Sequence, residues 1–377
     1  MGVRARLLDL VAPLSQNEEL LPGVTLVGAS EEAGPRLHFL ADDEPVAIEV
    51  ALAESQAPAF VRTSRLSFAY VATGPAGRSR APDVCRAVAQ RAEVNESAVL
   101  ASLEKEATEI SDARIREVRV DRLLEDAWCE GRRYHTLSPY VGCLVGCRYC
   151  YAQSHVALTR RLERRRPIPW GSYVDVRVNA AEVLEKELET LDVRTIKFCP
   201  IVSDPYHVIE ARYSLTRACL ETMKRASRKL SVLVLTRAAL VERDAALLGE
   251  LGAHVGVSLP TVDDDVRAHF EPRAASIPER LAALRALRAA GATTMAVVQP
   301  LLPGSIDELA DLVAAHCSSA SIGVLEGVEG AAADFADARF RHAREASWQT
   351  AQAERLLELL RQRGVAVWRE LPAECRA

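Results

Sequence analysis

Short apolar and β-branched runs alternate with longer amphipathic segments from about residue 170 onward. The short runs predict buried parallel strands, and apolar residues at helical spacing predict helices between them. The predicted strands are 195–201, 230–236, 254–259, 294–302 and 321–328. The predicted helices are 179–191, 215–229, 239–252, 276–291 and 305–317, with Ser276 and Ser305 as N-caps and Gly252 and Gly291 as C-terminal stops. This alternation predicts right-handed βαβ units.

About six such units fit between residues 134 and 330, which predicts a partial barrel rather than a complete eight-fold one. The fold class is therefore α/β, a partial (β/α)6 TIM-type barrel with an additional N-terminal α+β region. We expect the N-terminal region to cover 1–120 and to bind substrate or a partner. The barrel core is expected to cover 121–335, and a C-terminal helical extension over 336–377 is expected to close it.

Within the N-terminal region the alternation is irregular. The glycines and prolines within residues 73–82 predict a loop there. A charged stretch over residues 98–127 predicts a helical linker to the barrel.

The composition of the 377 residues favours a globular protein, with 49% hydrophobic and 26% charged residues. The net charge of −5 gives no general basic field for nucleic acid. No apolar run reaches the length of a membrane span, and the N-terminus is a poor signal peptide, so we expect a cytoplasmic location without membrane contact. Nine cysteines in a chain without an export signal favour metal binding or chemistry over disulfides.

Cys143, Cys147 and Cys150 form a C-x3-C-x2-C pattern, and Gly142 and Gly146 lie beside them. Three thiolates at this spacing converge only from a loop, and the two glycines allow one. Structural zinc requires a fourth ligand, for which His155 or Cys199 are candidates. A [4Fe–4S] cluster with three cysteines keeps one iron open to a chelating ligand. Cysteines that bind nothing are the third alternative, and the spacing favours the iron–sulfur cluster.

The segment "SPYVGCLVGCRYCYAQSH" (138–155) resembles the cluster motif of radical S-adenosylmethionine (SAM) enzymes, in particular their spore photoproduct lyase-like branch. The resemblance continues through "SDPYHVIEARYSLTR" (203–217), "VLTRAALVERD" (234–244), "VSLPTVDDDVRAHFEP" (257–272) and "PLLPG" (300–304). It implies a (β/α)6 partial barrel and a [4Fe–4S] cluster on Cys143, Cys147 and Cys150. It also implies SAM as cofactor, cleaved reductively into methionine and a 5′-deoxyadenosyl radical that abstracts hydrogen from substrate.

The resemblance further implies a SAM site built from five residues. Tyr149 would lie near the adenine, and Ser203 and Asp204 would approach the SAM amino group. Arg237, where the family often carries lysine, and Ser258 would hold the SAM carboxylate. From the residues alone, a packing aromatic, a turn-capping aspartate and a solvated arginine are the alternatives.

Three further residues have weaker counterparts. Gln299 would line the adenine pocket. Cys199 would return hydrogen to the product radical, although it lies four positions before Ser203, where the lyase pattern is tighter. Tyr151 would lie near that hydrogen path. The alternatives are a buried structural thiol for Cys199 and a packing side chain for Tyr151.

Five arginines follow the cysteines within 159–170, namely Arg160, Arg161, Arg164, Arg165 and Arg166. They could bind anionic substrate groups or an acidic electron donor such as flavodoxin or ferredoxin, or form a solvated helix face. The sequence thus predicts a radical SAM enzyme acting on an unidentified substrate, with a small molecule or peptide favoured. Repair of nucleic-acid lesions is the alternative, and a zinc-stabilised, non-catalytic binding protein is the alternative from another class.

Overall fold

The chain forms two compact units. Unit 1 contains residues 1–114, 125–133 and 151–169, and unit 2 contains residues 115–124, 134–150 and 170–377. The computed structural model describes residues 3–30, 35–52, 59–63, 66–105, 114–129, 132–162, 165, 168–198, 202–325, 329–369, 371–372 and 375. The segment 151–169, which directly follows the cysteine motif, therefore belongs to unit 1.

Unit 1 is built on an antiparallel sheet. The strand order is β1 (Glu19–Leu21), β2 (Val24–Ser30), β3 (Arg36–Ala41), β4 (Glu44–Leu52), β6 (Leu66–Ala72) and β5 (Val61–Arg62). Helices α1 (Val3–Asp9), α2 (Pro75–Lys105) and α3 (Ala152–Leu162) and strand β8 (Glu125–Cys129) complete its described elements. Alternate strand residues such as Leu37, Phe39 and Ile48 are buried, so one face of the sheet carries the core.

Two sequence predictions in this region are wrong. The predicted loop at 73–82 is helical, because α2 begins at Pro75 and continues through Pro82. Pro75 is the first residue of the helix, where proline is tolerated, and burial of Ala81, Val84 and Cys85 stabilises the helix on both sides of the internal Pro82. The predicted helical linker 98–127 is also interrupted, since residues 115–118 form strand β7 (Ile115–Val118).

Unit 2 contains the expected parallel barrel. Its parallel strands run in the order β17 (Ala366–Trp368), β16 (Ser319–Ile322), β15 (Thr293–Val298), β14 (His254–Ser258), β13 (Ser231–Thr236), β12 (Thr195–Phe198) and β9 (Arg132–Leu137). The sheet curls into part of a barrel, as the sequence predicts. The chain therefore places every loop that follows a strand at one edge of the sheet, where such folds hold their active sites.

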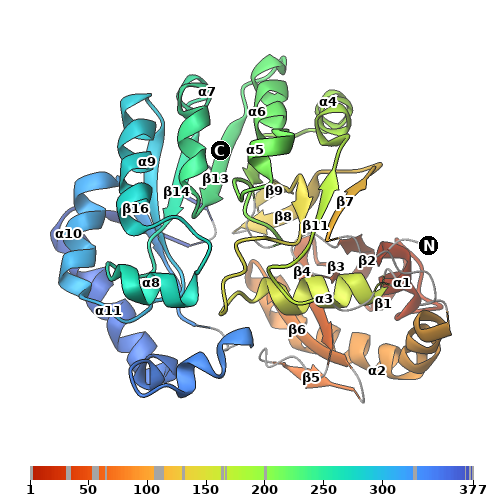
Figure 1. Cartoon of the computed structure of the whole chain (residues 1–377). Helices are drawn as coiled ribbons and strands as arrows, with labels where there is room; N and C mark the ends of the chain where they lie inside the picture. The colour runs from red at the N-terminus through yellow and green to blue at the C-terminus, as the bar shows by residue number, and fades with distance from the viewer. Residues whose placement is uncertain are drawn as a thin grey trace. The chain divides into compact units, whose positions relative to one another are not determined.

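Helices lie around the outside of this sheet (Figure 1). They are α4 (Ala180–Thr190), α5 (Glu210–Tyr213), α6 (Leu215–Arg225), α7 (Ala245–Glu250), α8 (Asp264–Phe270), α9 (Ile277–Ala289), α10 (Ile306–His316) and α11 (Ala346–Gln362). Ser276 and Ser305 accept hydrogen bonds from Glu279 N and Glu308 N, which confirms both predicted N-caps. A small second sheet pairs β11 (Val174–Arg177) with β7 and with β10 (Tyr140–Val141).

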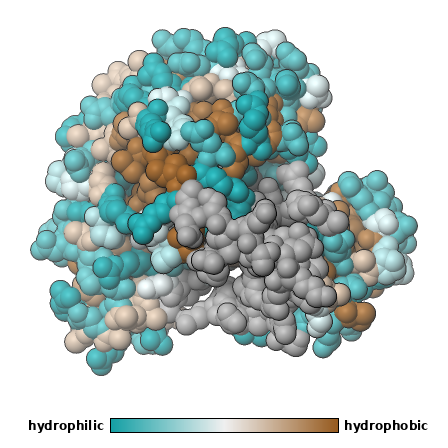
Figure 2. Space-filling model, turned by 45° about the vertical axis from the view of Figure 1, so that its right-hand side comes forward, coloured by the Kyte–Doolittle hydropathy of each residue, from teal (hydrophilic) through white to brown (hydrophobic). Residues whose placement is uncertain are grey.

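The core of unit 2 lies between the sheet and these helices. It is made mainly of valine, leucine, isoleucine and alanine side chains, including Val234, Val255, Leu284 and Leu309. Each fully buried leucine or valine contributes about 1.5–3 kcal/mol relative to an exposed one. On the face drawn in Figure 2 the described surface is mainly hydrophilic, with hydrophobic areas between the polar ones. No helix among the described residues has the length and apolar character needed to cross a membrane.

Candidate active site

The three cysteines lie on the loop that follows β10, the short strand directly after β9. Gly142 (φ +87°) and Gly146 (φ +62°) adopt the left-handed conformation that the sequence predicts for this loop. Gly142 N donates to Val202 O at 3.0 Å, which ties the loop to the segment after β12. The loop is thus fixed at the carboxyl edge of the sheet.

The thiols lie in an apolar and aromatic cluster. Cys143 and Cys147 are buried together with Tyr149 and Phe270, and Cys150 is half-buried. Burial raises the pKa of Cys143 and raises that of Cys147 further, while the cationic Arg237 opposes part of the effect at Cys147. The surroundings of the thiols therefore favour a bound group whose positive charge balances the negative charge of the thiolates.

Among the described residues, no three His, Cys, Asp or Glu side chains are placed to share one metal ion. A [4Fe–4S] cluster binds its cysteines through different iron atoms, so its ligands need not converge on a single ion.

Ser203 and Asp204 connect the loops of neighbouring strands. The Ser203 hydroxyl donates to Gly142 O at 2.8 Å. Asp204 Oδ1 accepts from Tyr206 N at 2.9 Å and from Thr236 Oγ1 at 2.6 Å, and its Oδ2 accepts from Arg237 N at 2.8 Å. Asp204 is buried, and each bond to its carboxylate holds backbone or side chains after β12 and β13. The pair therefore organises the edge of the barrel on which the cysteines lie.

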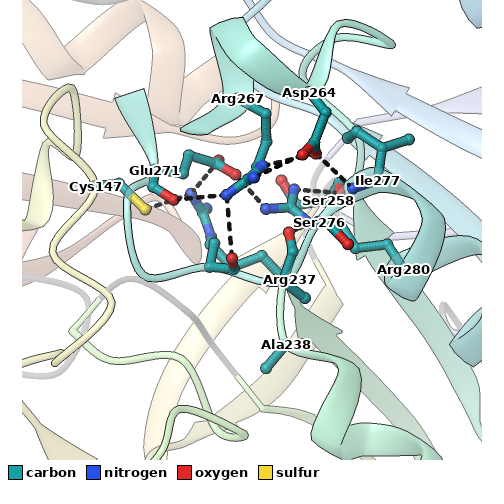
Figure 3. A network of polar contacts seen from close by, with 12 residues as sticks. Cys147, Arg237, Ala238, Ser258, Asp264, Arg267, Glu271, Ser276, Ile277 and Arg280 are labelled. Carbon is teal, nitrogen blue, oxygen red and sulfur yellow. Dashed lines mark hydrogen bonds and ion pairs between the residues drawn. The ribbon is translucent and has the colours of Figure 1, made fainter. Parts of the chain in front are cut away.

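Arg237 joins that edge to a cysteine. Its Nη1 lies 2.8 Å from Cys147 Sγ, 3.0 Å from Tyr149 Oη and 2.8 Å from Glu271 Oε1. Figure 3 shows the guanidinium between the sulfur and the carboxylate. The side chain is 16% exposed. A single cationic group thus faces a thiol, a phenol and a carboxylate.

Glu271 is the anion of this network. It follows α8, and its side chain and that of Arg280 on α9 are each 0% exposed. Glu271 Oε2 pairs with Arg280, and Oε1 accepts from Arg237 and from the Tyr149 hydroxyl. Burial alone would raise the pKa of Glu271, but the cations of Arg280 and Arg237 outweigh it and lower this pKa below its ordinary value. Glu271 is therefore held as a carboxylate.

Arg280 extends the network to the end of β14. Its Nη1 donates to Ser258 O at 2.8 Å, and its Nε donates to Ala275 O at 2.9 Å. The Ser258 side chain is buried, and its hydroxyl oxygen is without a hydrogen-bond partner among the described residues. A buried hydroxyl of this kind costs free energy unless a ligand completes its hydrogen bonding.

Gln299 contacts another residue of unit 2, and Tyr151 belongs to unit 1. Gln299 follows β15, is exposed, and donates from Nε2 to Ser321 Oγ at 2.9 Å. Tyr151 is exposed in unit 1, where its ring meets that of His155 edge-on with a centroid separation of 5.9 Å. Cys199 lies outside the described residues, as do Arg164 and Arg166.

Two important residues, Glu271 and Arg280, are not identified by the sequence analysis. The burial of Arg280 could have been predicted from the sequence, because Arg280 lies on the same helical face as the buried Ile277, Ala283 and Leu284. Glu271 lies in the family-like segment 257–272, but an isolated acid in a sequence is typical of a solvated position.

Comparison with known proteins identifies the barrel. Residues 137–315 match the family model described as the radical SAM superfamily. These residues, just under half of the chain, form a radical SAM domain. This confirms the family predicted from the cysteine motif, and it confirms that the protein is an enzyme. Members of this superfamily use a [4Fe–4S] cluster and SAM.

The chain also resembles proteins from distant organisms. It is 26% identical over 198 residues to an uncharacterized protein of Methanocaldococcus jannaschii, covering 52% of this chain and 71% of that protein. It is 31% identical over 185 residues to an uncharacterized protein of Mycobacterium tuberculosis, covering 46% of this chain and 51% of that protein. The match therefore spans about half of the mycobacterial relative.

Among solved structures, the chain is similar to a mutant spore photoproduct lyase with bound AdoMet and dinucleoside spore photoproduct. The sequence identity is 18% and the TM-score is 0.47, and the alignment covers 71% of this chain and 84% of the lyase.

The residues at the barrel edge fit the cofactors of the superfamily. Thiolates are ligands that iron–sulfur clusters select, and the loop supplies three of them. The cationic Arg237 beside Cys147 suits an anionic thiolate. The buried Ser258 hydroxyl, which has no hydrogen-bond partner in the described part of the chain, is available to a polar ligand. The donor set and its surroundings thus suit a three-cysteine cluster with a small polar ligand beside it.

Gly146→Ala is expected to destabilise unit 2 more than Gly252→Ala. Both glycines have nearly the same φ, +62° and +59°, so the conformational penalty of roughly 1–2 kcal/mol is shared. A Cβ at Gly146 would lie 2.8 Å from Gly171 Cα and would also overlap Arg273, whereas a Cβ at Gly252 meets nothing within 4 Å. We expect about 1–3 kcal/mol of additional loss at Gly146 in urea unfolding. Equal losses would contradict the close approach.

Proposed function

We propose that Cys143, Cys147 and Cys150 hold a [4Fe–4S] cluster that binds SAM, and that the enzyme abstracts hydrogen from a small molecule or peptide. The main support is the position of two buried thiols and one half-buried thiol on a fixed loop at the carboxyl edge of the barrel. When bound, the cluster and SAM supply a 5′-deoxyadenosyl radical as the hydrogen-abstracting species. The protein contributes binding, orientation and exclusion of water.

The proposed SAM-binding residues have different surroundings. Ser258 offers a buried hydroxyl, and Tyr149 offers an aromatic ring fixed by Glu271. Ser203 and Asp204 hold the loops after β10, β12 and β13, and the Asp204 carboxylate can accept a further bond from an ammonium group. The cationic guanidinium of Arg237 is proposed to bind the SAM carboxylate. Gln299, exposed and bonded to Ser321, is proposed for the outer part of the adenine site.

Hydrogen return to the product is a separate question. Cys199 as hydrogen donor and Tyr151 as a residue on its path stay predictions from the sequence. Cys199→Ala is the variant that addresses the first of them, because loss of a donor thiol alters the products without preventing SAM cleavage.

A reductant and a substrate complete the proposed reaction. We propose a flavodoxin or ferredoxin as the electron donor, and a substrate-binding or partner-binding role for the N-terminal region. The net charge of −5 favours a small molecule or peptide over duplex nucleic acid as substrate.

The test begins with protein purified without oxygen. We expect about four iron and four sulfide per chain, as a [4Fe–4S] cluster requires, and 5′-deoxyadenosine and methionine after addition of SAM and dithionite. Substrate classes are then compared by deuterium transfer from labelled peptides, small metabolites and oligonucleotides into 5′-deoxyadenosine. Colourless protein that contains one zinc, or a loaded cluster that never yields 5′-deoxyadenosine, would refute the proposal. Deuterium transfer from oligonucleotides alone would favour lesion repair.

A further inference from the structure

We propose that Arg237 is a positioning residue that donates a charged hydrogen bond to the Cys147 sulfur and thereby raises the reduction potential of the cluster. The inference rests on the proposed function, because it assumes that Cys147 is a cluster ligand. It assigns to Arg237 a contribution separate from the recognition of SAM.

The contact geometry supports a bond to sulfur. Arg237 Nη1 lies 2.8 Å from Cys147 Sγ and 2.8 Å from Glu271 Oε1. One guanidinium nitrogen of this type carries two hydrogens, which is enough for the sulfur and the carboxylate. Tyr149 Oη, at 3.0 Å, is the most distant of the three acceptors around Nη1 and shares these hydrogens with the sulfur and the carboxylate.

The guanidinium is fixed from both ends. The Arg237 backbone N–H donates to Asp204 Oδ2 at 2.8 Å, and the tip of the side chain pairs with Glu271. Glu271 is in turn held by Arg280, which is fully buried and anchored to the backbone oxygens of Ser258 and Ala275. The position of the cation against Cys147 is therefore set by the fold rather than by a mobile surface side chain.

The charges of the network favour the reduced state of a neighbouring cluster. Arg237 and Arg280 carry two positive charges and Glu271 one negative charge, so these three side chains retain one positive charge, with the Asp204 carboxylate at the Arg237 backbone and the Arg237 guanidinium at the sulfur. Reduction adds a negative charge to the cluster, and a nearby cation in a poorly solvated site stabilises that charge. Hydrogen bonds to the sulfurs and local charge are established determinants of cluster potential.

Arg273 provides a matched control. It also contacts the cluster loop, but it donates to the backbone oxygens of Gly171 at 2.8 Å and Val145 at 3.4 Å rather than to a thiol. Arg273→Gln and Arg237→Gln therefore remove the same charge near the same loop. Only Arg237→Gln removes a bond to sulfur.

The experiment measures the midpoint potential of loaded wild-type and variant proteins by dye-mediated titration followed by electron paramagnetic resonance. At a fixed potential, we expect Arg237→Gln to lower the ratio of reduced to oxidised cluster roughly tenfold, a shift of about 59 mV for a one-electron couple. Arg273→Gln is expected to shift the potential by much less, because Arg273 makes no bond to a cluster thiol. Equal shifts in both variants, or no shift in Arg237→Gln, would overturn the inference.

If the Arg237→Gln variant does not take up the cluster, the Arg237→Lys variant is measured in its place. It keeps a cation but lacks the planar fork that bonds sulfur and carboxylate together, so its potential should fall below that of the wild type. Where both variants load, lysine should lie above glutamine, and the reverse order would overturn the inference. Iron, sulfide and 5′-deoxyadenosine in the wild-type protein test the proposed function independently, so failure of one can be distinguished from failure of the other.

Discussion

Cys143→Ala is expected to yield protein without a stable [4Fe–4S] cluster and without SAM cleavage. The variant removes one of only three thiolates in the C-x3-C-x2-C motif, and alanine cannot replace a thiolate as a ligand to iron. Changes to groups that only support metal ligands already cost 10–100-fold, so loss of a ligand should lower 5′-deoxyadenosine formation by more than about 100-fold. Iron and sulfide analysis, together with the visible absorption of anaerobic protein, measures the loss directly.

Cys85→Ala is the matched control for this experiment. Cys85 is a fully buried thiol in α2 of unit 1, where burial raises its pKa to about 12 and keeps it neutral. It behaves as a small hydrophobic side chain, so its replacement should cost some stability but no iron. Retention of a full cluster in Cys143→Ala, or equal iron loss in Cys85→Ala, would show that the motif is not the ligand set.

The barrel could be predicted because its elements carry their own signals. The predicted strand 230–236 is observed as β13 (Ser231–Thr236), and the predicted helix 276–291 as α9 (Ile277–Ala289) with its Ser276 cap. Apolar runs and capping residues are local features, so they can be recognised without knowledge of tertiary contacts. The error at residues 73–82 has the opposite origin. Tertiary burial of Ala81 and Val84 stabilises a helix in a segment whose glycines and prolines predict a loop.

The site could be predicted only in part for a related reason. Cys143, Cys147 and Cys150 are close in sequence, so their spacing alone indicates a common centre. The ion network depends instead on Arg237, Glu271 and Arg280, which come from different loops and helices. These three side chains pair because β13 and β14 and the segments that follow them lie together at one edge of the sheet. A short sequence pattern does not predict such a tertiary contact.

Glu271→Gln is expected to destabilise unit 2 by about 3–5 kcal/mol, because it removes the anion between two buried arginines. The change keeps the shape of the side chain but leaves the fully buried Arg280 and the largely buried Arg237 without a carboxylate. Urea unfolding followed by tryptophan fluorescence reports mainly on this unit, since Trp170, Trp348 and Trp368 belong to it.

Glu250→Gln in α7 is the matched control, because Glu250 pairs with Lys224 at a position where both side chains are more than half exposed, 55% and 52%. Surface ion pairs contribute little, so we expect a change within about 1 kcal/mol. The pH dependence adds a second test. The pKa of Glu271 lies below its ordinary value, so its stabilising contribution is present above that value and is lost as the pH falls through the folded-state pKa. The stability difference between wild type and Glu271→Gln should therefore narrow on acidification. A difference that is small at neutral pH, or that widens in acid, would mean that the carboxylate does not hold the two arginines together.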